Sequence, residues 1–178
     1  MEEEKKEQLD NLLKILDKEI KAYEELKELF KEKREILKKA KHDDLGVLDN
    51  KILALSEKIK KINKSRQNLA QKITGKDSNM SQFIEYAEKE ASEYVEPLKN
   101  RKVKICNIIP EITLLNNQNV ELLKHGIIIS NKMLETIIDA FAPQGSYYNG
   151  AGKSDTHDID VWTISEEIWG KSWIWCRL

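Results

Sequence analysis

The sequence has little of what strand-rich and disulfide-stabilised proteins need. Its 178 residues include seven glycines, three prolines, three phenylalanines and two cysteines. Sandwiches and barrels use many turn residues and aromatics, and small disulfide-stabilised folds use many cysteines, so both classes are disfavoured. The chain has the length of one ordinary domain. With 34% charged and 40% hydrophobic residues, its composition is typical of long amphipathic helices.

The sequence also has no excess of charge of one sign and no long hydrophobic run. Thirty basic residues balance 31 acidic ones, so no net field attracts nucleic acid or an anionic membrane. No apolar run approaches the ~20 residues that a membrane-spanning helix requires. The first segment, MEEEKKEQLD, is the reverse of a signal peptide, which begins basic and continues apolar. We therefore expect a soluble, cytoplasmic protein with no nucleic-acid partner and no membrane insertion.

What the sequence does contain is heptad-spaced apolar residues, which predict two long helices over about 1–41 and 45–74. The first repeat comprises Leu9, Leu13, Leu16, Ile20, Tyr23, Phe30 and Leu37. The second comprises Leu48, Ile52, Leu55, Ile59, Ile62, Leu69 and Ile73, with Arg66 as its interruption. The short connection KHDDLGVLDN indicates a turn and a fresh N-cap, so an antiparallel hairpin is the economical arrangement. Gly75 is expected to end the second helix.

Two further helices are predicted, a short one over 79–91 and a long one over about 96–141. Pro97 suits the start of the long helix, whereas Pro110 inside it predicts a kink or a break. The expected fold is all-α: an antiparallel, coiled-coil-like bundle of three long helices and one short helix over residues 1–142. An irregular linker and tryptophan-rich tail occupy residues 143–178.

Two motifs in the linker could carry chemistry, and neither matches a known site. The segment GAGKS around Lys153 lacks the first glycine of a phosphate-binding loop, because position 147 is Tyr147. The segment DTHDID holds one histidine, His157, and three aspartates, but matches no established metal-ligand spacing. Solvated linker is the favoured interpretation of both. We expect no catalytic residue, no metal and no cofactor.

Several single residues have ordinary structural interpretations. Cys106 lies among isoleucines and is expected to be a buried, small apolar residue. The basic runs from Lys58 to Arg66 and from Arg101 to Lys104 lack the aromatic partners of nucleic-acid sites. Solvated helix faces are the favoured interpretation of these runs.

The last long helix carries more apolar surface than one core-facing stripe of roughly 100° requires. Between residues 122 and 141 either the helix is sandwiched between others, or it leaves an apolar face for a partner helix. The tail raises a similar question, because all four tryptophans lie there: Trp162, Trp169, Trp173 and Trp175. Folding back on the bundle, binding another chain and remaining without fixed structure all stay open for this tail.

The layout resembles the flagellar export chaperones of the FlgN type over about 150 residues, ending near Gly152. Two long charged helices come first, with an arginine, Arg66, near the end of the second, and the short helix MSQFIEYA follows. The most telling pieces are the leucine–asparagine stretch in LLNNQNVELLKHGIIISNKMLETI and the segment YYNGAG. The sequence departs from the pattern at Pro110 and in the tail after Asp160.

The resemblance implies a chaperone and not an enzyme. Such a protein binds the C-terminal helical segments of flagellar hook-associated proteins, keeps them unassembled and delivers them to the type III export apparatus. Components of the export gate or export ATPase are further candidate partners. By the match to the family's substrate-binding region, the expected contact residues are Leu122, Ile129, Met133, Leu134, Ile137, Ile138 and Phe141.

Two rival interpretations stay open at this point. The strong heptads of the hairpin also suit a structural or adaptor protein that forms a homodimeric coiled coil. An enzyme that uses the GAGKS or DTHDID segment is a weaker rival.

Overall fold

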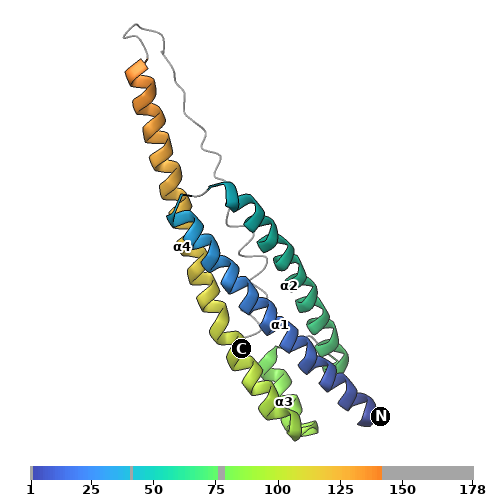
Figure 1. Cartoon of the computed structure of the whole chain (residues 1–178). Coiled ribbons are helices and arrows are strands. Elements are labelled where there is room, and N and C mark those ends of the chain that lie inside the picture. Colours follow the sequence, from blue (N-terminus) through green and yellow to red (C-terminus); the bar gives the residue numbers. More distant parts are fainter. Residues whose placement is uncertain (1, 41, 76–78, 142–178) are drawn as a thin grey trace.

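The computed structural model describes residues 2–40, 42–75 and 79–141, and this part of the chain is helical without a strand (Figure 1). The α-helices are α1 (Glu2–Lys38), α2 (Leu45–Thr74), α3 (Met80–Glu90) and α4 (Val95–Phe141). Short 3-10 helices, η1 (His42–Asp44) and η2 (Ser92–Tyr94), precede α2 and α4. The predicted all-α class, with three long helices and one short helix, is confirmed.

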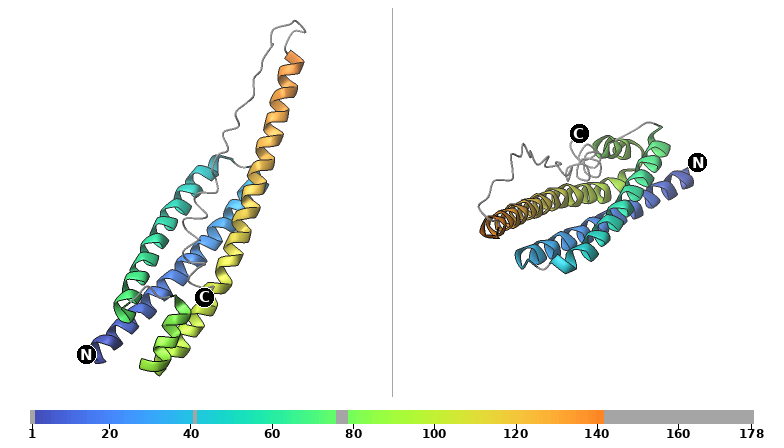
Figure 2. Two further views of the ribbon diagram at one scale, coloured as in Figure 1. Left: turned by 180° about the vertical axis from the view of Figure 1, so that it is seen from behind. Right: turned by 90° about the horizontal axis from the view of Figure 1, so that it is seen from above.

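Helix α1 occupies the centre, with α2 and α4 packed on different sides of it and α3 beside the first part of α4 (Figures 1 and 2). Three polar pairs between α1 and α4 each join residues that are 84 apart: Asp17–Arg101, Lys27–Glu111 and Arg34–Gln118. A constant separation means that α1 and α4 run in the same direction. Helix α2 runs opposite to both, as the hairpin prediction requires.

Local chemistry accounts for the ends of the shorter elements. Gly75 ends α2 in the left-handed conformation, at φ 73°, and its N–H donates to the Gln71 carbonyl at 2.8 Å. Glycine adopts this conformation without steric cost. Asn79 and Gln82 then form a reciprocal capping box that starts α3. The segment expected to supply an N-cap before α2 does so with Asp44, although the Asp44 side chain makes no capping hydrogen bond.

Helix α4 continues through Pro110, so this proline does not end it. Pro110 is exposed, whereas its neighbours Ile109 and Ile112 are buried against the bundle. The carbonyl that loses its partner, that of residue 106, therefore belongs to the outer side of the helix, where water can satisfy it. Cys106 itself is half-buried, so the prediction of a buried cysteine is wrong.

The core explains why the apolar stripe of α1 is wider than one heptad seam. Predicted positions such as Leu16 and Tyr23 are fully buried, but so are Leu12 and Leu26, which lie outside the predicted repeat. Because α1 is flanked by α2 on one side and α4 on another, it needs two apolar seams. The basic residue Lys27 lies beside the second seam and pairs with Glu111 of α4, which raises the pKa of Lys27.

The interruption at Arg66 is a buried ion pair with Glu19 of α1. Arg66 is 1% exposed and Glu19 0%. The Arg66 Nη1 donates to both carboxylate oxygens, at 2.5 Å for Oε2, and the Tyr23 hydroxyl donates to Oε1 at 2.9 Å. The interpretation of Arg66 as part of a solvated basic face is therefore wrong. The same correction holds for Arg101, which is half-buried and makes a bidentate pair with Asp17 at 2.9 and 2.7 Å.

Removing one member of this buried pair should destabilise the bundle more than replacing both members by apolar residues. We expect Arg66→Ala to cost about 3–5 kcal/mol of unfolding free energy, because it leaves the Glu19 carboxylate buried without its cation. The double variant Glu19→Met/Arg66→Met should cost less than that single variant. Urea denaturation followed by circular dichroism measures both, with Lys64→Ala, an exposed position on α2, as control. A loss below about 1 kcal/mol for Arg66→Ala would contradict the assignment.

Candidate partner-binding surface on the last helix

Helix α4 extends beyond the end of α1, the helix that it packs against. Helix α1 has 37 residues and ends at Lys38, whereas α4 has 47. Because paired residues of α1 and α4 are 84 positions apart, Lys38 lies level with Leu122 of α4. Leu122 and Leu123 are half-buried, and every described residue from Lys124 to Ile137 is exposed. Figure 1 shows this segment projecting past the α1–α2 turn, and 19 further residues span about 28 Å.

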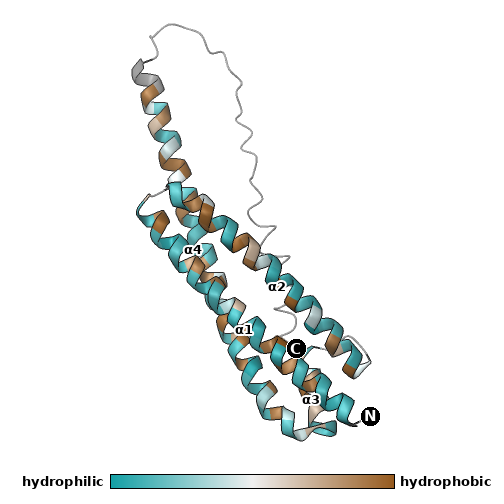
Figure 3. Cartoon of the chain, turned by 45° about the vertical axis from the view of Figure 1, so that its right-hand side comes forward, coloured by the Kyte–Doolittle hydropathy of each residue, from teal (hydrophilic) through white to brown (hydrophobic). Residues whose placement is uncertain are grey.

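The exposed face of the projection continues the buried face of the packed part. Residues at steps of three and four form one heptad line along α4: Ile105, Ile108, Ile112, Leu115, Asn119, Leu122, Gly126, Ile129 and Met133. Ile105, Ile108, Ile112 and Asn119 are buried, Leu115 and Leu122 are half-buried, and Ile129 and Met133 are 58% and 63% exposed. Such spacing keeps side chains on one helix face. The projection therefore presents a core-type seam without the partner that α1 supplies below it (Figure 3).

The α4 stripe, as we call it, consists of apolar residues on this line or beside it on the projection: Leu122, Ile129, Met133, Leu134 and Ile137. All five are predicted contact residues. Leu122 lies half-buried at the base, and the other four are 52% to 63% exposed.

The two remaining predicted contact residues belong to the last turn of α4. Ile138 and Phe141 lie within the helix, but their side chains are outside the described part of the structure. Sequence reasoning did not single out Ile127 and Ile128 as contact residues, and they are 53% and 49% exposed.

Polar contacts fix the position at which the packed seam ends. Asn119 is 1% exposed, and its Nδ2 donates to the backbone carbonyl of Phe30 in α1 at 2.9 Å. One residue earlier, Gln118 accepts a hydrogen bond from Arg34. A buried amide that is bonded to the neighbouring backbone resists sliding of the two helices, because displacement would leave it without a partner. The start of the α4 stripe is therefore set by the α1–α4 register.

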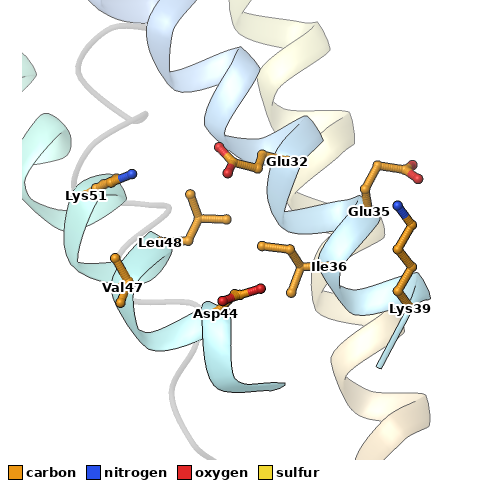
Figure 4. A pocket seen from close by; sticks show the side chains of 8 residues that line it. All are labelled: Glu32, Glu35, Ile36, Lys39, Asp44, Val47, Leu48 and Lys51. Atoms are coloured by element: carbon orange, nitrogen blue, oxygen red, sulfur yellow. The ribbon is translucent and has the colours of Figure 1, made fainter. Parts of the chain in front are cut away.

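A second feature near the hairpin turn is a hollow of about 440 Å³ between α1 and α2 (Figure 4). Ile36 and Leu48 point toward each other across it, and the exposed Val47 lies on its rim. Its charged residues have both signs. The Lys38 ammonium holds the pKa of the Glu35 carboxyl at the rim below its usual range. This mixture of charges does not favour a ligand of one sign.

The remaining sequence motifs fall elsewhere. The segments GAGKS and DTHDID and all four tryptophans lie outside the described residues. Within the described ranges, no three His, Cys, Asp or Glu side chains gather as metal ligands would. None of the described helices combines the length and apolar character needed to cross a bilayer.

The fold is that of a helical bundle in which one helix extends beyond its partners. Comparison with protein-family models places it further: residues 1–156 match the FlgN protein family, and the chain belongs to that family. The resemblance inferred from the sequence is confirmed. The family is one of flagellar export chaperones and not of enzymes. No curated protein and no solved structure matches the chain.

The two halves of the heptad line on α4 should differ sharply in their effect on stability. Ile112→Asp places a charge in the core and should cost at least about 3 kcal/mol, or prevent folding. Met133→Asp on the projection should change the unfolding free energy by no more than about 0.5 kcal/mol. Urea titrations of both variants measure the contrast. Equal destabilisation by the two would show that the α4 stripe is covered in the free protein.

Proposed function

We propose that this protein is a cytoplasmic export chaperone for flagellar hook-associated proteins. It binds their C-terminal helical segments, keeps them from assembling early and delivers them to the type III export apparatus. Family membership supplies the chaperone class. The observation that supports binding at this place is the α4 stripe, which continues a core seam into solvent.

The stripe suits an amphipathic helix of the client. Four of its residues are more than half exposed, and burying a large apolar side chain yields about 1.5–3 kcal/mol. Ordering a flexible client segment costs roughly 2–5 kcal/mol of the contact energy. The surplus corresponds to micromolar binding or somewhat tighter. This strength allows a chaperone to shield a segment and still release it at the export apparatus.

The client helix takes the place that α1 holds farther down the seam. Gly126 lies on the heptad line between Leu122 and Ile129, and apart from the helix's own backbone no atom lies within 4 Å of a Cβ atom built there. The glycine leaves a notch in an otherwise bulky seam. A large side chain of the client fills this notch, as knobs fill holes in a coiled coil.

The rival interpretation, a homodimer formed through the hairpin, has less support. The heptad residues on which it depends include Leu48, Leu55 and Ile59, and these are buried within the chain. The seam that would join two copies therefore already joins α2 to the rest of the bundle.

Calorimetric titration with C-terminal segments of hook-associated proteins from the same genome tests the proposal. We expect one-to-one binding at micromolar Kd or tighter. Ile137→Asp should weaken binding by at least about 30-fold, which corresponds to a loss of 2 kcal/mol at the centre of an interface. The matched control is Leu114→Asp, since Leu114 lies on the opposite face of the same helix and is 59% exposed against 52% for Ile137.

Two results would contradict the proposal. If Ile137→Asp and Leu114→Asp weakened client binding equally, the client would not bind at the α4 stripe. Absence of binding for every segment, together with a dimer in light scattering that Ile137→Asp dissociates, would assign the stripe to self-association.

Filling the notch provides an independent prediction. Gly126→Leu replaces a poor helix former in the helix interior, so the free protein should keep or slightly increase its helicity and stability. Client binding should nevertheless weaken about tenfold or more, because the added side chain occupies the hole. Gly126→Ala separates the effects, since it improves helix propensity with little added bulk. Tighter binding by Gly126→Leu would show that no client side chain enters the notch.

A further inference from the structure

A second surface, unrelated to the α4 stripe, lies on the hairpin of α1 and α2. A groove of about 650 Å³ runs between these helices. Three apolar residues, Ile15, Ala22 and Ile62, contribute to its lining. Four lysines line it as well, Lys18 and Lys21 from α1 and Lys58 and Lys61 from α2, against a single carboxylate, that of Glu25.

These lysines differ from the other interhelical cations of the molecule. Lys33 pairs with Asp49 across the hairpin at 2.6 Å, and Arg101 and Lys27 pair with carboxylates across the α1–α4 seam. Within the described ranges, none of the four groove lysines forms an ion pair, and all four are exposed. Positive charge has thus been gathered on one groove of a chain whose net charge is −1.

Such an arrangement works against the folding of the free hairpin. Two lysines from each helix reach the same groove, so charges of like sign face each other across a helix–helix seam. Opposite charges at the flanking positions of such seams stabilise helix pairing, and like charges oppose it. An anionic partner would turn this repulsion into attraction. Binding sites typically contain residues that lower the stability of the free protein because they serve to bind a ligand.

We propose that this groove binds an acidic amphipathic helix of another protein. The apolar residues of the partner would pack on the half-buried Ile15 and Ile62, above the buried Ala22, and its carboxylates would pair with the lysines on both sides. The shape favours a helix over a membrane, because a concave groove between two helices holds a rod and a bilayer surface is broad. The described lining has no aromatic residue on which bases could stack, which disfavours nucleic acid.

This groove and the α4 stripe lie on different parts of the molecule. The groove lies between α1 and α2 on the turns around Ala22, whereas the stripe begins beyond the level of Lys38. The two sites can therefore be occupied at once. The proposal stands whether or not the α4 stripe binds hook-associated proteins.

The test uses the full chain and a designed 18-residue helical peptide with isoleucine and leucine at heptad spacing and glutamates beside them. A peptide with glutamine in place of every glutamate is the control. We expect the acidic peptide to bind at micromolar Kd by fluorescence anisotropy and the glutamine peptide at least tenfold more weakly. Raising the salt concentration from 0.05 to 0.5 M should weaken binding of the acidic peptide at least tenfold, because partly exposed ion pairs are screened.

Charge reversal identifies the site. Lys21→Glu/Lys61→Glu should abolish binding of the acidic peptide while leaving the thermal midpoint unchanged or higher, since it removes repulsion in the free groove. The charge-matched control, Lys104→Glu/Lys132→Glu on α4, and the stripe variant Ile129→Asp should both bind as the wild type does.

Three outcomes would overturn the proposal. The first is equal binding of the two peptides, and the second is unchanged binding by Lys21→Glu/Lys61→Glu. The third is a preference for phosphatidylserine vesicles with no peptide binding, which would assign the groove to a membrane surface.

Discussion

The structure depends on the position of α1 between two neighbours. A helix in this position must carry two apolar seams, and it must hold each neighbour in a defined register. The Glu19–Arg66 pair fixes the antiparallel neighbour by placing one buried cation opposite one buried carboxylate. The Asn119 amide on the Phe30 carbonyl fixes the parallel one. Uniform apolar seams would allow these helices to slide by a heptad, and the buried polar groups make such a slide costly.

The two registers together determine where function can reside. Because α1 ends before α4, the register decides which residues of α4 are core and which are exposed. Leu122 marks the change within a heptad pattern that itself continues. On the hairpin, the antiparallel register brings basic turns of α1 and α2 to one groove. Both proposed sites are consequences of how helices of unequal length and charge are aligned.

Sequence patterns predicted the helices well because heptads, Gly75 and Pro97 are local signals. The same patterns could not show that Arg66 is buried, because its partner Glu19 is 47 positions away. An arginine on an apolar stripe could have suggested a buried partner, but the identity of that partner follows from the hairpin register. The width of the apolar surface after Leu122 was visible in the sequence. Whether that surface was core or free depended on where α1 ends beside it, which is a property of packing.

The shared direction of α1 and α4 has a consequence for the protein at high concentration. Any helix that covers the α4 stripe would lie nearly end to end with α1 and present α4 with the same kind of seam. A second copy's α1 satisfies that description, because it carries the apolar spacing that α4 already accepts. Exchange of α1 between chains, in the manner of domain swapping, would form the same α1–α4 seam between two copies. The buried ion pair opposes it, since an α1 that leaves its own hairpin must first part Glu19 from Arg66.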